Sequence, residues 1–342
     1  MQKKAIAILQ YLLFLGLGIF LVWWSLHKIP ADKWDAFKNS LKTANYWLMI
    51  PVFFILSGSH VIRTLRWRVL IKPLGHNPSI PNTFFAVMIG YLANLAIPRL
   101  GEVLKCTILA RYENVPADKL VGTILIERVC DVISLGIVFL IAFTVQFDTV
   151  GEYGQALIGK VFKNNNGTVS FNNVLIAVAL LIIIISMITF IFKKYQHIGF
   201  VKKINDIVKG IGTGLGSILK LEQKGLFLVY TCLIWLLYIL GTWVGLLATT
   251  GTSHLGLDTA ISALAFASIG MIITPGGIGA YAFFLAEILS LKDIPAEIGL
   301  ANGTLQWFAQ FMIVLIVGFI SVGALAWYNK NKKYESSSAH KS

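Results

Sequence analysis

Six apolar segments, each near or above the length needed to cross a bilayer, constrain the fold of this chain. A helix needs about 20 predominantly apolar residues to span the hydrocarbon core. Hydrophobic residues make up 56% of the sequence and charged residues only 13%, which is far from the balance of a soluble domain. The sequence therefore predicts an all-α polytopic membrane protein, with spans at residues 6–25, 45–62, 121–146, 173–192, 226–249 and 304–327.

Two further apolar stretches, residues 82–110 and 259–291, are interrupted in the middle. Proline removes a backbone donor and glycine permits a tight reversal, so each stretch is expected to form a re-entrant hairpin of two half-helices. The second half-helices are expected to begin near Gly101 and Gly279, where their free N–H groups favour an anion. The predicted hairpin tips are Pro98, Gly101, Pro275, Gly276, Gly277 and Gly279.

The distribution of lysine and arginine favours six full transmembrane helices plus these two hairpins. In this topology the N-terminus, residues 63–81, 111–120 and 193–225 and the tail lie inside with 19 basic residues, whereas the outer segments hold 7. Such an excess on the cytoplasmic side is the usual bias, and it places both termini in the cytoplasm. The apolar residues of 193–225 recur at helical spacing among lysines, which indicates either a helix on the inner membrane surface or a soluble amphipathic linker.

The two interrupted regions resemble each other in an ordered series of positions, which indicates an internal repeat. The repeat units lie at about residues 45–146 and 226–327, joined by the span 173–192 and the basic loop 193–225. An odd number of crossings separates them, so we expect an inverted repeat, as in many transporters whose substrate site lies near the midplane. We predict one domain over residues 1–328 and a disordered cytoplasmic tail over residues 329–342.

Charged residues inside these apolar segments are the main candidates for a functional site. Each would cost about 2.5–3.5 kcal/mol at the centre of a helix, so all are expected to face a protein interior or a polar cavity. Pairs within one helix, such as Glu102 with Lys105 and Arg128 with Asp131, could lock the hairpin without touching substrate. Binding of an anionic headgroup is the other interpretation, and the candidates for substrate binding or translocation are Arg99, Glu102, Lys105, Glu127, Arg128, Asp131, Tyr281 and Gln306.

The basic and polar candidates of the two repeat units have different expected roles. Arg99 is the sharpest candidate, because a guanidinium at a hairpin tip can hold phosphate with a bidentate fork. Arg63, Arg66 and Arg68, which follow the second span, are more readily explained as anchors for lipid headgroups or as determinants of orientation, and a role in the transport path is the alternative. In the second repeat unit the tip is almost uncharged, and its polar candidates are Tyr281, Glu287, Gln306 and Gln310.

Three motifs follow one another along the chain: Pro98-Arg99-Leu100-Gly101-Glu102, Glu127-Arg128-Val129-Cys130-Asp131 and Thr274-Pro275-Gly276-Gly277-Ile278-Gly279. In this order they resemble the transmembrane region of lysylphosphatidylglycerol synthases and its stand-alone, flippase-like relatives, over roughly residues 5–327. The resemblance implies movement of aminoacylated phospholipids between leaflets, or handling of polyprenyl-phosphate sugar carriers. It also implies that Arg99, Glu102, Glu127, Arg128 and Asp131 are the family's charged positions.

Two departures from the family pattern limit what the resemblance implies. Ala282 stands where many relatives have an acidic residue, so no carboxylate role is expected there. The full-length synthases continue into a cytoplasmic transferase domain, whereas this chain ends in a short Lys/Ser tail, so we do not expect it to make lysyl lipid alone.

The favoured function is a flippase-like transporter of the cytoplasmic membrane that moves a phosphate-bearing lipid through a polar midplane cavity. A membrane-embedded enzyme using Glu102, Glu127 or Asp131 as acid or base is a second hypothesis, although no histidine cluster or metal-binding spacing accompanies these residues. An accessory lipid-binding protein without transport is a third. We expect no cofactor, metal or nucleic-acid partner, and a separate lipid-modifying transferase is an expected protein partner.

Overall fold

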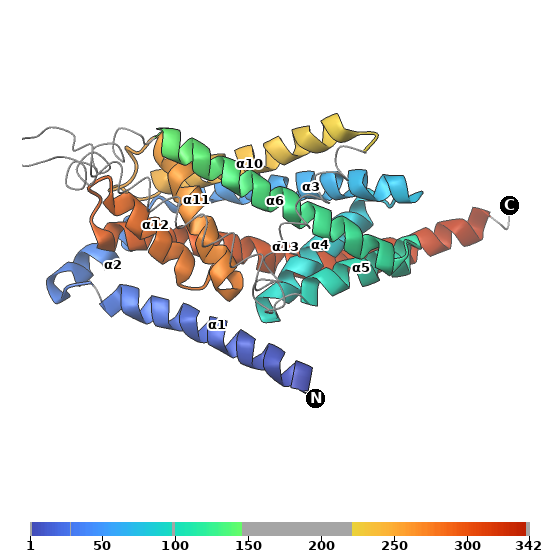
Figure 1. The fold of residues 1–342 in the computed structure, drawn as a ribbon, viewed down its shortest axis with the longest axis horizontal. Helices are drawn as coiled ribbons and strands as arrows, with labels where there is room; N and C mark the ends of the chain where they lie inside the picture. The colour runs from blue at the N-terminus through green and yellow to red at the C-terminus, as the bar shows by residue number, and fades with distance from the viewer. Residues whose placement is uncertain (1, 28, 98–99, 146–220, 340–342) are drawn as a thin grey trace, which may run out of the picture. The chain divides into compact units, whose positions relative to one another are not determined.

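The computed structural model describes residues 2–27, 29–97, 100–145 and 221–339 (Figure 1). The chain divides into two units, residues 1–142 with 220–342, and residues 143–219. The second unit lies almost entirely outside the described residues, so the fold and site below belong to the first unit. The predicted span 173–192 and most of the predicted loop 193–225 lie outside the described residues and stay predictions.

Helices and short 3-10 turns form the regular structure of the described residues, which confirms the all-α membrane class. Their order is α1 (Gln2–His27), η1 (Ala31–Lys33), α2 (Trp34–Lys42), η2 (Tyr46–Leu48), α3 (Met49–Ile71), η3 (Lys72–Leu74), α4 (Ile80–Ala96), α5 (Leu100–Glu113), α6 (Ala117–Val145), α10 (Lys224–Leu247), α11 (Leu257–Ile273), η4 (Pro275–Gly277), α12 (Ala280–Ser290) and α13 (Ala296–Ala339).

Three helical segments in the described part of the chain are long and apolar enough to cross a membrane. Helices α1 and α6 cover two more of the predicted spans, and the four helices α4, α5, α11 and α12 fall in the two interrupted stretches. These helices agree with a multi-pass membrane protein, whereas the count of six spans and two hairpins stays a prediction. The three long apolar segments are Tyr46–Leu74, Lys224–Leu247 and Ala296–Lys330.

Two helix ends differ from the sequence prediction. Helix α3 continues to Ile71, so the assignment of Arg63, Arg66 and Arg68 to an inner loop is wrong. Arg63 and Arg66 are buried, because carboxylates on another helix compensate their charge within the apolar surroundings. Helix α13 continues to Ala339, so most of the tail for which disorder was expected is helical.

The two interrupted stretches break where the sequence places a proline, which confirms the predicted positions of the breaks. Ile97 and Thr274, the residues before Pro98 and Pro275, have extended backbone conformations. The proline ring disfavours the helical region for the residue before it, so α4 and α11 end there. The chain resumes as α5 at Leu100 and as α12 after Gly279, and each pair of helices packs together (Figure 1).

Small residues allow the two helices of each hairpin to approach closely. A Cβ atom at Gly101 of α5 would overlap the carbonyl oxygen of Gly90 in α4. In the second hairpin, a Cβ atom at Gly270 would lie 2.6 Å from the backbone nitrogen of Tyr281. Both hairpins therefore depend on a residue without a side chain where their helices cross.

Replacing Gly101 with alanine is expected to destabilise the protein by about 1–3 kcal/mol or more, because a methyl group that meets backbone cannot be relieved by a change of rotamer. Gly122→Ala in α6 is the matched control, since a Cβ atom there meets nothing within 4 Å and alanine is favoured in helices. Unfolding in detergent by added dodecyl sulfate, followed by tryptophan fluorescence, measures both. Equal stability of the two variants would contradict the close crossing.

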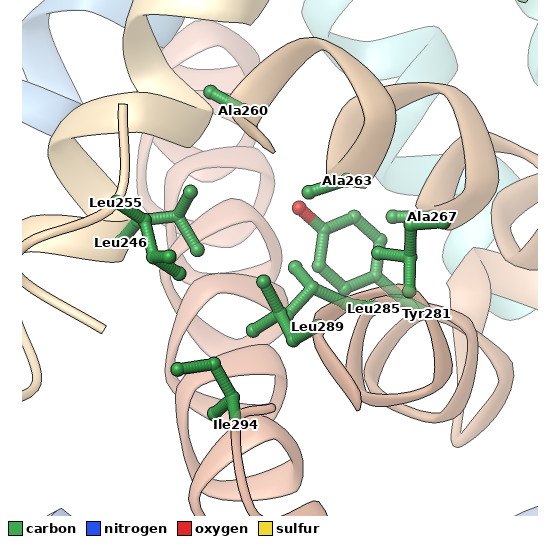
Figure 2. Close-up of a cluster of buried hydrophobic side chains, with 10 residues drawn as sticks. Leu246, Leu255, Ala260, Ala263, Ala267, Tyr281, Leu285, Leu289 and Ile294 are labelled. Carbon is green, nitrogen blue, oxygen red and sulfur yellow. The ribbon is translucent and has the colours of Figure 1, made fainter. Parts of the chain in front are cut away.

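The second hairpin is held by a cluster of buried apolar side chains between α10, α11, α12 and the start of α13 (Figure 2). The ring of Tyr281 lies against Ala263 and Ala267, whose small side chains leave room for it (Figure 2). Leu285 and Leu289, one and two turns further along α12, are fully buried in the same cluster. This packing fixes which face of α12 can point toward the rest of the protein.

The order of helices in α3–α6 recurs in α10–α13: a long helix, a hairpin of two shorter helices, and another long helix. Helix α3 packs against α10, and α13 packs against α4, so the two sets are interleaved. This order agrees with the predicted repeat units 45–146 and 226–327. The inverted orientation of the units stays a prediction.

Candidate functional site

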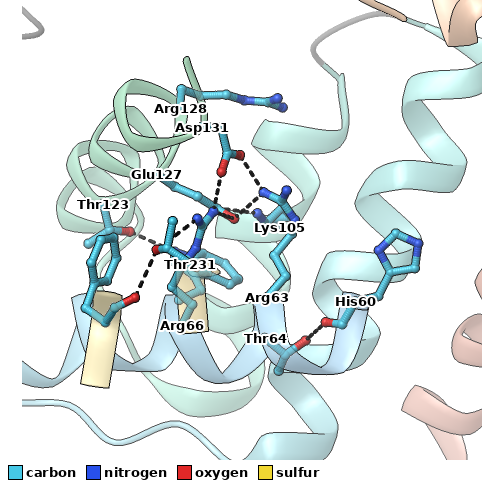
Figure 3. Close-up of polar contacts among 12 residues, drawn as sticks. His60, Arg63, Thr64, Arg66, Lys105, Thr123, Glu127, Arg128, Asp131 and Thr231 are labelled. Carbon is cyan, nitrogen blue, oxygen red and sulfur yellow. Dashed lines mark hydrogen bonds and ion pairs between the residues drawn. The ribbon is translucent and has the colours of Figure 1, made fainter. Parts of the chain in front are cut away.

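Five ionised side chains from three helices form one buried group, which we call the ion cluster: Arg63 and Arg66 of α3, Lys105 of α5, and Glu127 and Asp131 of α6 (Figure 3). Arg63 Nη1 donates to Glu127 Oε1 at 2.9 Å and to Asp131 Oδ2 at 2.7 Å. Arg66 Nη2 donates to Asp131 Oδ1 at 2.8 Å, and Lys105 Nζ donates to Glu127 Oε2 at 3.2 Å. Both carboxylates therefore use their two oxygens within the cluster.

The ion cluster differs from the pairing expected within single helices. Lys105 pairs with Glu127 rather than with Glu102, and Asp131 pairs with the α3 arginines rather than with Arg128. Glu102 and Arg128 instead join α5 to α6 through a separate bond of 3.1 Å, with both side chains partly exposed. The expectation of local pairs is corrected, because a side chain in a packed bundle can reach a stronger partner on the facing helix.

Aromatic rings lie against two of the cations of the cluster. Lys105 Nζ lies 4.3 Å from the centre of the Trp67 ring, and Arg66 lies over the ring of Phe227. Rings placed in this way stabilise a cation in dry surroundings. Three cations nevertheless face two carboxylates, so the cluster keeps one formal positive charge in excess.

A cavity of about 410 Å³ lies between the two hairpins and is bounded by helices of both repeat units. Beside it, Gly276 at the tip of the second hairpin lies against Leu95 of α4, and Trp307 Nε1 of α13 donates to the Gly276 carbonyl at 2.8 Å. A cavity of this size is within the range of small-molecule binding sites. The polar side chains that line it come in two groups.

The first group, which we call the cationic wall, consists of His60 and Arg63 of α3, Tyr91 and Asn94 of α4, and Arg128 of α6. Within the described residues, Arg63 Nε and His60 Nδ1 are buried without a hydrogen-bond partner. Asn94 Oδ1 accepts the backbone N–H of Gly101 at 2.8 Å, so this side chain uses one of the free donors predicted at the start of α5.

The second group, which we call the neutral wall, contains hydroxyl, amide and aromatic side chains from α10, α12 and α13. The Tyr281 hydroxyl donates to Gln306 Oε1 at 3.3 Å, and Gln306 Nε2 donates to Asn302 at 2.7 Å. The rings of Trp307 and Phe311 stack at 5.5 Å. The members that line the cavity are Thr242, Tyr281, Gln306, Trp307, Gln310 and Phe311.

The predicted site residues separate into three groups in the structure. Arg128, Tyr281, Gln306 and the tip residue Gly276 line the cavity, whereas Glu102 does not. Lys105, Glu127 and Asp131 lie in the ion cluster and are bonded to each other or to arginine, as expected for a structural lock. Arg99 and Pro98 lie outside the described residues, so the role proposed for Arg99 stays a prediction.

Sequence reasoning missed several residues of the cavity. For Arg63 a role in the transport path was only the less favoured alternative, and His60, Tyr91, Asn94 and Trp307 were not singled out, although all of them line the cavity. His60 and Arg63 are three residues apart, so a helix through residue 63 would have placed them on one face. Gln310 was named among the polar candidates and lines the cavity.

Comparisons with known proteins agree with the resemblance noted from the motifs. A family model described as "Lysylphosphatidylglycerol synthase TM region" matches residues 7–318. The chain is also 22% identical over 297 residues to a UPF0104 membrane protein of Methanocaldococcus jannaschii, which covers 84% of this chain and 88% of that protein. No solved structure matches the chain.

Proposed function

This chain belongs to the family of the lysylphosphatidylglycerol synthase transmembrane region, and from that premise we propose that it is a flippase-like transporter of a phosphate-bearing lipid. The lipid headgroup crosses through the cavity between the hairpins, while the acyl or prenyl chains stay in the bilayer. In this proposal the protein lies in the cytoplasmic membrane with both termini in the cytoplasm, and a separate lipid-modifying transferase supplies its substrate.

The observation that supports the proposal best is the charge of the cavity lining. Two guanidinium groups, Arg63 and Arg128, line it, and no carboxylate is found among its described lining residues. Guanidinium groups bind phosphate through paired N–H donors, and both of these side chains line the cavity. A phosphate in the cavity would also compensate the excess charge of the adjoining ion cluster.

The position of the cavity supports transport more than catalysis. Irregular backbone at membrane depth is tolerated where it is buried in protein or faces a water-filled cavity, and Gly276 in the break of the second hairpin lines this cavity. Glu127 and Asp131, two of the three acids that an enzyme mechanism would use, are fully engaged by arginine and lysine, and the third, Glu102, is paired with Arg128 and does not line the cavity. They are therefore poorly placed to exchange a proton with a substrate in the cavity.

Replacing Arg128 with glutamine is expected to slow lipid movement by about ten-fold to a hundred-fold, because a charge-assisted hydrogen bond is worth about 1.5–3 kcal/mol. Purified protein in vesicles that contain fluorescent phosphatidylglycerol, with bleaching of the outer leaflet by dithionite, measures the rate. Arg128 is partly exposed and its partner Glu102 is too, so the variant is expected to fold. Arg99→Ala is expected to slow movement as well.

Lys38→Gln on α2 is the matched control, because it removes a positive charge from an exposed pair away from the cavity. It is expected to move lipid at the wild-type rate. If vesicles with the wild-type protein exchange lipid no faster than protein-free vesicles, the proposed function is contradicted. If Arg128→Gln moves lipid at the wild-type rate, Arg128 does not contact the headgroup during transport.

A further inference from the structure

We infer that the transported headgroup combines its phosphate with a neutral, hydroxyl-rich group, such as glycerol or a sugar, and that it has no ammonium group. This inference rests on the proposed function and names the substrate class of the same cavity. It follows from the unequal chemistry of the cationic wall and the neutral wall.

The cationic wall suits the phosphate alone. Arg63 and Arg128 supply guanidinium donors, and His60 and Asn94 beside them add further polar atoms. Arg63 is held in place from behind by Glu127 and Asp131 and from the side by the Tyr238 hydroxyl at 3.1 Å. The Arg63 guanidinium group is therefore fixed in position before a ligand arrives, which lowers the ordering cost of binding.

The neutral wall suits hydroxyl groups. Gln306 and Gln310 are four residues apart on α13 and both line the cavity, and each amide can donate and accept hydrogen bonds, as a hydroxyl also does. The Tyr281 hydroxyl bonds to Gln306 and also contacts Gln310 and Thr242, so these groups form one uncharged network. Trp307 and Phe311, whose rings stack on each other, add uncharged aromatic surface to the cavity lining beside it.

An ammonium group would have no free acidic partner in this cavity, because Glu102 does not line it and is paired with Arg128. None of the lining side chains in the described structure is a carboxylate, and the nearby Glu127 and Asp131 are bonded to Arg63, Arg66 and Lys105. An aminoacylated headgroup would instead place its ammonium in a cavity that already contains two guanidinium groups. Like charges placed together are strongly rejected at a binding surface.

Three fluorescent lipids with the same acyl chains test this inference in one set of vesicles. Phosphatidylglycerol has a phosphate and two hydroxyls, phosphatidic acid has the phosphate alone, and lysylphosphatidylglycerol has added ammonium groups. We expect phosphatidylglycerol to change leaflets at least about ten-fold faster than lysylphosphatidylglycerol, and faster than phosphatidic acid. Equal rates for phosphatidylglycerol and either of the other two lipids would overturn the inference.

Gln310→Glu tests the same inference in the opposite direction. It places a carboxylate of nearly the same shape in the neutral wall, where an ammonium could then pair with it. The preference for phosphatidylglycerol over lysylphosphatidylglycerol is expected to fall by about ten-fold or more. Gln223→Glu at the start of α10 adds the same charge away from the cavity and is expected to leave the preference unchanged.

The outcomes separate this inference from the proposed function. If no lipid moves faster than in protein-free vesicles, the proposed function fails. If lysylphosphatidylglycerol moves as fast as phosphatidylglycerol, transport stands and the inferred headgroup class is wrong. Release of trapped glycerol phosphate without any lipid movement would assign the same chemistry to a soluble substrate and overturn the lipid assignment.

Discussion

Glu127→Gln is expected to lower the free energy of unfolding by about 3–5 kcal/mol, because it leaves buried cations without their counter-charge. Glu127 is 3% exposed and accepts from Arg63, Arg66 and Lys105, which lie on two other helices. Its removal would leave Asp131 as the sole carboxylate facing three cations in the described cluster. The loss should therefore loosen the packing of α3, α5 and α6 together.

Glu102→Gln is the matched control for this prediction. It also removes one negative charge from an ion pair that joins α5 to α6. Glu102 and its partner Arg128 are partly exposed, however, with side chains 38% and 55% accessible. An exposed ion pair is worth about 0–1 kcal/mol, so the control should be nearly as stable as the wild type. Unfolding by dodecyl sulfate in mixed micelles measures both variants, and equal losses would contradict the structural role of the ion cluster.

The sequence was informative about the hairpins because their breaks have local causes. A proline constrains the residue before it, which explains the extended conformations of Ile97 and Thr274. Gly276 and Gly279 have φ angles of 62° and 70°, a region that other residues rarely adopt. Such causes depend only on neighbouring residues, so the positions of the breaks could be predicted without knowledge of the fold.

The partners of the intramembrane charges could not be predicted in this way. Glu127 and Arg63 are 64 residues apart in sequence, and spacing within a helix indicates only which local pairs are possible. Treating Arg63 as the end of a span also followed from hydropathy, which scores a charge as a boundary even where a carboxylate compensates it. The true end of α3 at Ile71 depends on those tertiary partners.

The neutral wall could be predicted only in part from the sequence. Tyr281 and Gln306 could be selected as polar residues in apolar helices, but their bond to each other and the nearness of Trp307 depend on how α12 packs against α13. Polar residues in a membrane helix indicate that a site exists. The packing decides whether they face a cavity or only each other.

Ser268→Trp is expected to stop lipid movement, because an indole would occupy the cavity between the hairpins. Ser268 of α11 lines this cavity, and its hydroxyl bonds only to the Leu264 carbonyl of its own helix among the described residues. The substitution therefore removes one hydrogen bond within a helix and, among the described residues, no side-chain hydrogen bond between helices. Ser253→Trp is the matched control, since Ser253 is exposed and does not line the cavity.

The rate at which fluorescent phosphatidylglycerol changes leaflets in vesicles with the Ser268→Trp protein tests most directly whether the headgroup crosses between the two hairpins. The vesicles should contain equal amounts of folded protein, checked by size-exclusion chromatography before reconstitution. We predict wild-type rates for Ser253→Trp and the protein-free rate for Ser268→Trp. A wild-type rate for folded Ser268→Trp would show that the lipid takes another path.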